Sequence, residues 1–305
     1  MDRREFIKKG LAIGASAGLT MLGGGVINLF AGDKKGKVPD LVAVKGGEPD
    51  AMFDKGIKAL GGMGAFIKKG QTVLVKPNIG WDKSPEMAAN TNPILVKRII
   101  EHCFNAGASK VYVFDHTVSS WQACYKNSGI EDAAKGAGAQ VVPASSPNVY
   151  EKVTIPAGKK LMNAKVHELM LEADVFINVP VLKHHSATQM TAAMKNLMGV
   201  VFDRSFFHNN DLHQCIADIA KFRKPALNIL DAYRVLTGNG PQSQNPADVS
   251  VKKMLLLSPD IVAIDVAAAA ILEMKTKYIK YIEYAARDNL GIMELDKLNI
   301  ERISL

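Results

Sequence analysis

Short apolar runs alternate with longer segments of helical pattern along this chain. Most of the runs are apolar at every position, which is typical of parallel strands covered on both faces. The alternation of strands and helices predicts an α/β fold, with a doubly wound, mostly parallel sheet and helices on both faces. The predicted strands are residues 41–45, 72–76, 110–115, 140–142, 175–179, 227–231 and 253–257.

Capping signals mark the start of two predicted helices. Residues 93–106 follow Thr91 and Asn92, either of which can accept a hydrogen bond from the first turn of a helix. Residues 259–274 are mostly apolar and follow Ser258, which we expect to cap a second helix.

The chain is expected to carry one folded domain over residues 38–305, because the alternation of strands and helices continues without a break. No internal repeat divides this region. Residues 144–161 are less regular, and we expect them to form a small insertion or hairpin within the domain.

Residues 1–31 resemble a twin-arginine export signal, with Arg3 and Arg4 ahead of a weakly apolar stretch. The glycines in that stretch disfavour a stable membrane anchor, although an uncleaved membrane helix is the alternative. We therefore expect the twin-arginine export machinery to carry the folded protein to the periplasm or another extracytoplasmic space.

Replacing Arg3 and Arg4 together by lysine is expected to abolish export, because this export route recognises the arginine pair. Fractionation of cells that produce each form measures this directly. Unchanged export of the double variant would rule out the twin-arginine interpretation.

Charge and cysteine content exclude several classes of protein. The net charge of +8 includes no run of four basic residues, which favours small anions over nucleic acid as partners. Three scattered cysteines are too few for a disulfide framework or an iron–sulfur cluster, so any divalent metal would depend on histidines and carboxylates. The motifs of P-loop ATPases, serine hydrolases and dinucleotide-binding enzymes are missing.

Polar side chains lie at or just beyond the ends of several predicted strands. Lys76 ends one strand and Asn78 comes just after it, Asp115 and Asp231 end two others, and the strand 175–179 leads to Lys183. Ligands of open α/β sheets bind outside the carboxyl ends of the strands, so these residues are candidates for one binding rim. For any one of them, a solvated strand end is the simpler interpretation.

Lys183 and His185 come where we expect a helix to begin, and backbone amides there would help to bind an anion. Lys195 and Asn196 would lie near the end of that helix. We expect Lys76 to share one site with Lys183 and His185, because parallel strands present their carboxyl ends at one edge. The alternative is a purely structural ion pair for Lys76.

Histidines and carboxylates also suggest a metal site. His185, His208 and His213, together with Asp115 or Asp231, would suit zinc, nickel or iron. The alternative is a set of surface or capping histidines.

Five motifs in order resemble the domain-of-unknown-function family three-six-two, and the resemblance covers residues 41–305. The motifs are Val-Leu-Val-Lys76-Pro-Asn78, Asn178-Val-Pro180-x-Leu-Lys183-x-His185, Lys195-Asn196-x-x-Gly199, Arg204-x-x-x-His208 and Gly240-Pro241.

The sequence differs from this family at two points, and the family itself is similar to another one. His184 stands where the family usually has threonine, and the ferredoxin-like cysteine cluster of many relatives is missing. The family is distantly similar to the N-terminal domain of nickel-pincer lactate racemases, where histidines and lysines act around an organometallic cofactor. That similarity concerns the fold and implies no activity.

The leading functional hypothesis is an exported enzyme that acts on a small carboxylate or phosphate, either by itself or with a bound metal or organometallic cofactor. The alternative is a non-catalytic periplasmic ligand-binding or cofactor-carrier protein. The expected catalytic residues are Lys183, His185 and His208, and the expected substrate-binding residues are Lys76, Asn78, Asp115, Lys195 and Asn196.

Asp265 lies inside an otherwise apolar predicted helix. A carboxylate in such a place needs hydrogen-bond donors to offset its desolvation, so we expect a structural role for Asp265.

Overall fold

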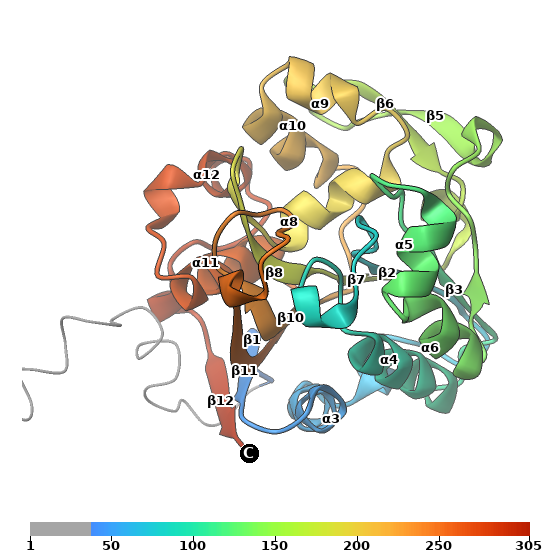
Figure 1. The fold of residues 1–305 in the computed structure, drawn as a ribbon, viewed down its shortest axis with the longest axis vertical. Coiled ribbons are helices and arrows are strands. Elements are labelled where there is room, and N and C mark those ends of the chain that lie inside the picture. The colour runs from blue at the N-terminus through green and yellow to red at the C-terminus, as the bar shows by residue number, and fades with distance from the viewer. Residues whose placement is uncertain (1–37) are drawn as a thin grey trace, which may run out of the picture.

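A ten-stranded mixed sheet forms the centre of the molecule, in the order β12-β1-β11-β10-β7-β2-β3-β4, with β8 paired to β10 and β9 paired to β8 (Figure 1). The structure is a computed structural model that describes residues 38–305, so the proposed export signal lies outside the described residues. The strands are β1 Leu41–Lys45, β2 Thr72–Pro77, β3 Lys110–Val113, β4 Gln140–Val141, β7 Val175–Val179, β8 Val181–His185, β9 Gln189–Thr191, β10 Leu227–Leu236, β11 Val249–Ser258 and β12 Ile300–Ser304.

Most strand pairs in this sheet are parallel, which confirms the predicted α/β class. The strands β10, β7, β2, β3 and β4 run parallel to their neighbours in that series. Strand β11 runs antiparallel to both β10 and β1. Strands β10 and β11 extend beyond the predicted apolar runs because their outer ends pair as a hairpin, with a bulge between Ala232 and Arg234.

Each face of the sheet supports its own hydrophobic core. Along β2, Val73 and Val75 enter one core and Leu74 enters the other, as the alternation of side chains in a strand requires. Figure 1 shows the two groups of helices on opposite sides of the sheet. One group is α3 Pro49–Ala59, α4 Pro93–Asn105, α5 Trp121–Asn127 and α6 Ile130–Gly136; the other includes α7 Leu169–Glu172, α8 Ala193–Asn196, α9 Ser205–Asn209, α10 Leu212–Ile219, α11 Ile261–Ile271 and α12 Lys280–Arg287.

The predicted capping residue is observed for one of the two helices and not for the other. Asn92 caps α4 by accepting a hydrogen bond from the backbone N–H of Ile94. The predicted Ser258 cap of the helix 259–274 is wrong, because Asp260 accepts from Val262 and its successor in the first turn. Helix α11 therefore begins at Ile261.

The predicted helix start at Lys183 and His185 is also wrong. Both residues lie in β8, and the chain then turns back to form β9, with Lys183 opposite Thr191. The mostly parallel sheet thus carries a short antiparallel arm at this edge. The arm projects Lys183 and His185 from a strand rather than from a helix terminus.

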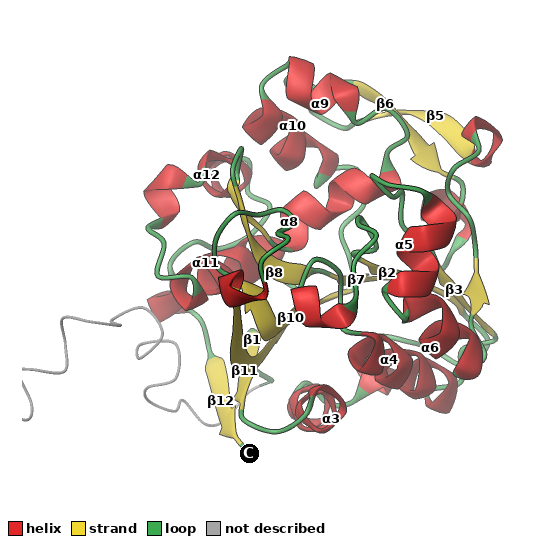
Figure 2. Cartoon of the chain, in the orientation of Figure 1, coloured by secondary structure: helices red, strands yellow, loops and turns green. Residues whose placement is uncertain are grey.

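A separate two-stranded antiparallel sheet pairs β5, Tyr150–Thr154, with β6, Asn163–His167 (Figure 2). This hairpin reaches beyond residue 161, and Phe202 donates its backbone N–H to the carbonyl of Lys165 at the edge of β6.

Within residues 38–305, no helix has both the length and the apolar character needed to cross a bilayer.

Candidate functional site

A cavity of about 450 Å³ opens where β2, β3 and β8 end. It lies at a switch point of the sheet, since the chain continues from β2 to β3 on one side while β7 flanks β2 on the other. We call this space the rim cavity. Its lining residues are Asn78, Gly80, Trp81, Asp115, His116, Val118, Lys183, His185, Ser186, Ala187, Thr191, Lys195, Asn196, Met198, Gly199, Arg204, Ser205, His208 and Pro241.

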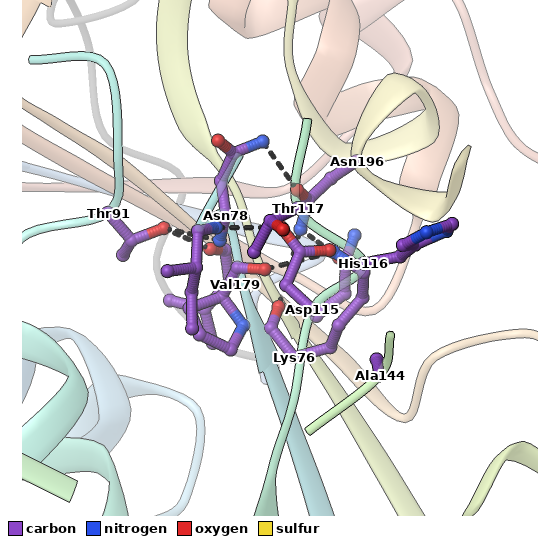
Figure 3. A network of polar contacts seen from close by, with 12 residues as sticks. Lys76, Asn78, Thr91, Asp115, His116, Thr117, Ala144, Val179 and Asn196 are labelled. Atoms are coloured by element: carbon purple, nitrogen blue, oxygen red, sulfur yellow. Dashed lines mark hydrogen bonds and ion pairs between the residues drawn. The ribbon is translucent and has the colours of Figure 1, made fainter. Parts of the chain in front are cut away.

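A buried ion pair forms the floor of the rim cavity. Lys76 has no exposed surface, and its Nζ lies 2.7 Å from Oδ1 of Asp115 (Figure 3). Lys76 also donates to the carbonyl of Pro77, while Oδ2 of Asp115 accepts from the backbone N–H of Ile79. Burial lowers the pKa of Lys76, and the nearby Asp115 carboxylate counteracts this effect.

Gly199 leaves the space that this ion pair occupies. A Cβ at this position would overlap the Asp115 carboxylate and lie 2.8 Å from Nζ of Lys76. The carbonyl of Gly199 also accepts the backbone N–H of His116, so the same residue fixes the loop after β3. The glycine of the Lys195-Asn196-x-x-Gly199 motif is therefore required by close approach.

Lys183 is held at the wall of the cavity without an ion-pair partner in the part of the chain that the structure describes. Its Nζ donates to the carbonyl of Ala89 and to Oδ1 of Asn78, the latter at 3.2 Å. Burial, reinforced by the charge of Lys195, lowers the pKa of Lys183 to about 7.

Two more cations line the cavity. Burial, together with the charge of Arg204, lowers the pKa of Lys195 to about 8. Arg204 donates to the carbonyls of His116 and Thr117, which ties α9 to the loop after β3. Among the described residues that line the cavity, Asp115 is the single acidic side chain, and Lys76 already balances it.

A chain of buried amides fixes the orientation of Asn78. Each amide donates its NH₂ group to the oxygen of the next, so Oδ1 of Asn78 must face Lys183. From the cavity inward the chain is Lys183 Nζ, Asn78, Asn196, Asn178, Asn228 and the carbonyl of Ser258, with successive N···O distances of 3.2, 3.0, 2.9, 3.0 and 3.2 Å.

His185 is neutral in this environment. Burial and the charge of Lys195 lower its pKa to about 3, and its Nδ1 accepts a hydrogen bond from Ala187. The ring proton therefore resides on Nε2, which makes His185 a hydrogen-bond donor and a weak base. His208, on α9, also lines the cavity, and burial lowers its pKa as well.

The structure does not bring the four proposed metal ligands together. His185 and His208 line the rim cavity, whereas His213 stacks on Tyr281 outside it. Asp231 accepts from the backbone N–H groups of Asn92 and Tyr233, and burial raises its pKa to about 6. Across residues 38–305 no three histidine, cysteine or acidic side chains cluster as a metal site. Asp231 and His213 lie outside the group predicted from the sequence, because spacing along the chain does not determine which way a side chain points.

The other predicted residues gather around one space. Asn78, Asp115, Lys183, Lys195 and Asn196 line the rim cavity, and Lys76 reaches it through Asp115. Gly199, Arg204 and Asn178 were recognised in the sequence only as members of the quoted motifs, with no role assigned. Asn228 was not singled out at all, because it lies inside an apolar run without a motif.

Asp265 supports the site from below. Its two carboxylate oxygens accept the backbone N–H groups of Ala193 and Met194 at the start of α8, the helix that carries Lys195. Burial raises the pKa of Asp265 to about 7.

Asp265→Asn is expected to lower the free energy of unfolding by about 1–3 kcal/mol, because the amide NH₂ would face a backbone N–H. We expect a smaller effect on anion affinity, since Asp265 does not line the rim cavity. Urea denaturation and calorimetric titration measure the two effects. Lost affinity at unchanged stability would place Asp265 in the site itself.

The family comparison covers the whole rim cavity. The family described as "Domain of unknown function (DUF362)" matches residues 73–270, well over half of the 305-residue chain. The chain belongs to this family. The matched segment of the DUF362 family includes every residue that lines the cavity.

Two further proteins are similar to this DUF362 chain. The thylakoid-associated protein sll1697 of Synechocystis sp. is 28% identical over 244 residues, which are 77% of this chain and 73% of that protein. The lactate racemase apoprotein from Thermoanaerobacterium thermosaccharolyticum matches with a TM-score of 0.42 and 16% identity. That match covers 68% of this chain and 53% of the racemase, so the chain spans about half the racemase's length.

Proposed function

We propose that the rim cavity binds a small organic anion, a carboxylate or a phosphate, and that the protein transforms it by proton transfer. The observation that carries this proposal is the charge of the cavity. Lys183, Lys195 and Arg204 face one space whose single carboxylate, Asp115, is paired with Lys76. Such an excess of positive charge in a buried place is relieved by an anion.

The cavity residues divide into binding and proton-transfer roles. Lys195 and Arg204 hold the charge of the ligand, and neutral His185 donates a hydrogen bond to one of its oxygens. Lys183 gives or takes a proton, because a pKa of about 7 leaves both of its forms available near neutral pH. His208 is a second candidate for proton transfer, since it lines the same cavity and histidine can act as a general acid or base.

Calorimetric titration of the purified chain with lactate, 2-hydroxyglutarate and inorganic phosphate tests binding. We expect saturable binding of at least one of these anions. In Lys195→Met the affinity falls by about tenfold or more, because a hydrogen bond to a charged group contributes about 1.5–3 kcal/mol. Lys126→Met, which removes an exposed lysine of α5, leaves it unchanged. Equal affinities in the two variants would contradict the proposal.

Turnover separates the enzyme from the alternative, a ligand-binding or cofactor-carrier protein. Conversion of a bound anion, followed by nuclear magnetic resonance, supports the enzyme. Saturable binding without conversion supports the carrier.

Anion affinity is expected to fall as the pH rises through 7 and 8, where Lys183 and Lys195 lose their protons. The protonated lysines attract the anion, so affinity is highest below pH 7. Lactate is a suitable probe because its carboxylate stays ionised throughout this range. Titrations at constant ionic strength measure the trend, and an affinity that rises with pH would contradict it.

Export remains part of the proposal. The expected signal at residues 1–31 lies outside the described residues, and the paired substitution of Arg3 and Arg4 tests it.

A further inference from the structure

We propose that Lys183 is a nucleophile that forms an imine with an organic anion carrying a ketone or aldehyde group. This inference rests on the proposed function, because the rim cavity must first bind the anionic part of the molecule. It adds a covalent step and narrows the ligand class from organic anions to carbonyl-bearing ones, such as 2-oxo acids and aldehyde phosphates.

The two buried lysines of the site differ in what holds them. Lys76 is fully enclosed and paired with Asp115 at 2.7 Å, so its amine has a counter-ion and does not line the cavity. Lys183 lines the cavity, and within residues 38–305 no carboxylate forms an ion pair with it. An amine without a counter-ion in a buried, positively charged place favours its neutral form, which is the nucleophilic one.

The hydrogen bonds of Lys183 suit a neutral amine. The carbonyl of Ala89 and Oδ1 of Asn78 accept two N–H bonds. A neutral amine has two N–H bonds and one lone pair, so both acceptors stay satisfied while the lone pair remains free to react. Asn78 cannot rotate its amide to offer NH₂ instead, because its own NH₂ group donates to Asn196.

The positions of the other cations suit a ligand with a carbonyl next to an anionic group. Lys195 and Arg204 hold the carboxylate or phosphate, which brings the carbonyl carbon within the same cavity as Nζ of Lys183. Binding in a fixed orientation replaces a bimolecular encounter by an internal reaction.

The imine step balances without a further reactant. The lone pair of Nζ forms a bond to the carbonyl carbon, and one amine proton passes to the carbonyl oxygen to give a carbinolamine. The second amine proton then passes to the hydroxyl oxygen, the C–O bond breaks as the C=N bond forms, and the oxygen leaves as water. Protonation of the imine nitrogen by solvent restores one N–H, which Asn78 or Ala89 accepts.

Reductive trapping tests the proposal on the complete chain. We incubate the protein with pyruvate, 2-oxoglutarate or glyceraldehyde 3-phosphate in the presence of cyanoborohydride, then map modified peptides by mass spectrometry. We expect one saturable reduced adduct, on Lys183, for at least one probe. 2-Hydroxyglutarate lacks the carbonyl and should compete with the adduct-forming probe without forming an adduct itself.

Two variants serve as controls. Lys183→Met removes the amine at similar length and should abolish the adduct, whereas Lys126→Arg should leave it unchanged. Peptide mapping of the unaltered chain decides the site even where Lys183→Met fails to fold.

The outcomes separate this inference from the proposed function. An adduct only on exposed lysines, or none on Lys183 with any of the three probes, overturns the imine. Calorimetric binding of lactate, 2-hydroxyglutarate or phosphate in that case leaves the anion-binding part of the proposed function in place. An absence of binding for all these anions overturns the proposed function instead.

Discussion

Lys76→Met is expected to destabilise the protein by about 3–5 kcal/mol, because removal of one partner from a buried ion pair leaves the other charge uncompensated. Asp115 would keep one hydrogen bond, from the backbone N–H of Ile79, and lose its cation. Both side chains are almost fully enclosed, so water cannot replace the ammonium group at low cost. Chemical denaturation measures the loss.

A surface ion pair of similar geometry provides the matched control. Nζ of Lys135 lies 2.6 Å from Glu131, but the Lys135 side chain is 59% exposed. Lys135→Met should therefore cost less than about 1 kcal/mol. The double variant Lys76→Met with Asp115→Asn should recover part of the loss, since it removes the buried charge. Equal losses in the two single variants would show that burial of the Lys76 pair has no energetic consequence.

The hydrophobic pattern identified most of the sheet but could not give the direction of every strand. The predicted apolar run of β11 resembles those of the parallel strands, because a strand segment buried on both faces has one pattern whether it runs parallel or antiparallel. The connection from β10 to β11, residues 237–248, is about as long as a short parallel crossover, so its length does not settle the direction either. The hydrophobic pattern predicted the buried strands β1, β2 and β7 most clearly.

The sequence could predict those site residues that lie at the ends of parallel strands, and it predicted the others less well. Asn78 contacts Lys183 because β2 and β7 are parallel neighbours and β8 continues from β7. Arg204 acts through the carbonyls of His116 and Thr117, and such long-range contacts have no local signal in the sequence. Asp231 also ends an apolar run predicted as a strand. Its carboxylate accepts the backbone N–H groups of Asn92 and Tyr233 instead of facing the cavity.

The floor and the wall of the rim cavity differ in charge. Asp115 neutralises Lys76 in the floor, so the floor contributes shape and rigidity more than charge. Among residues 38–305, the cavity-lining cations without an ion-pair partner are in the wall, at Lys183, Lys195 and Arg204. A change in the floor should therefore affect the ligand indirectly, through the position of the wall.

Gly199→Ala tests this coupling and is expected to weaken both folding and binding. The added methyl group would displace Asp115 and Lys76, which overpacks a buried place and costs about 1–3 kcal/mol of stability. Because Asp115 lines the cavity and Gly199 fixes the loop that Arg204 contacts, we expect anion affinity to fall by about tenfold, or about 1.4 kcal/mol.

Gly136→Ala is the control for this variant. Gly136 closes helix α6 and has no atom within 4 Å of an added Cβ, so alanine there should leave stability equal or slightly higher and affinity unchanged. Denaturation and calorimetry on both variants give the comparison. If Gly199→Ala folds and binds anions as well as Gly136→Ala does, the buried pair does not position the wall of the cavity. If it loses stability but keeps its affinity, the pair supports the fold alone, and the anion depends on the side chains of the wall.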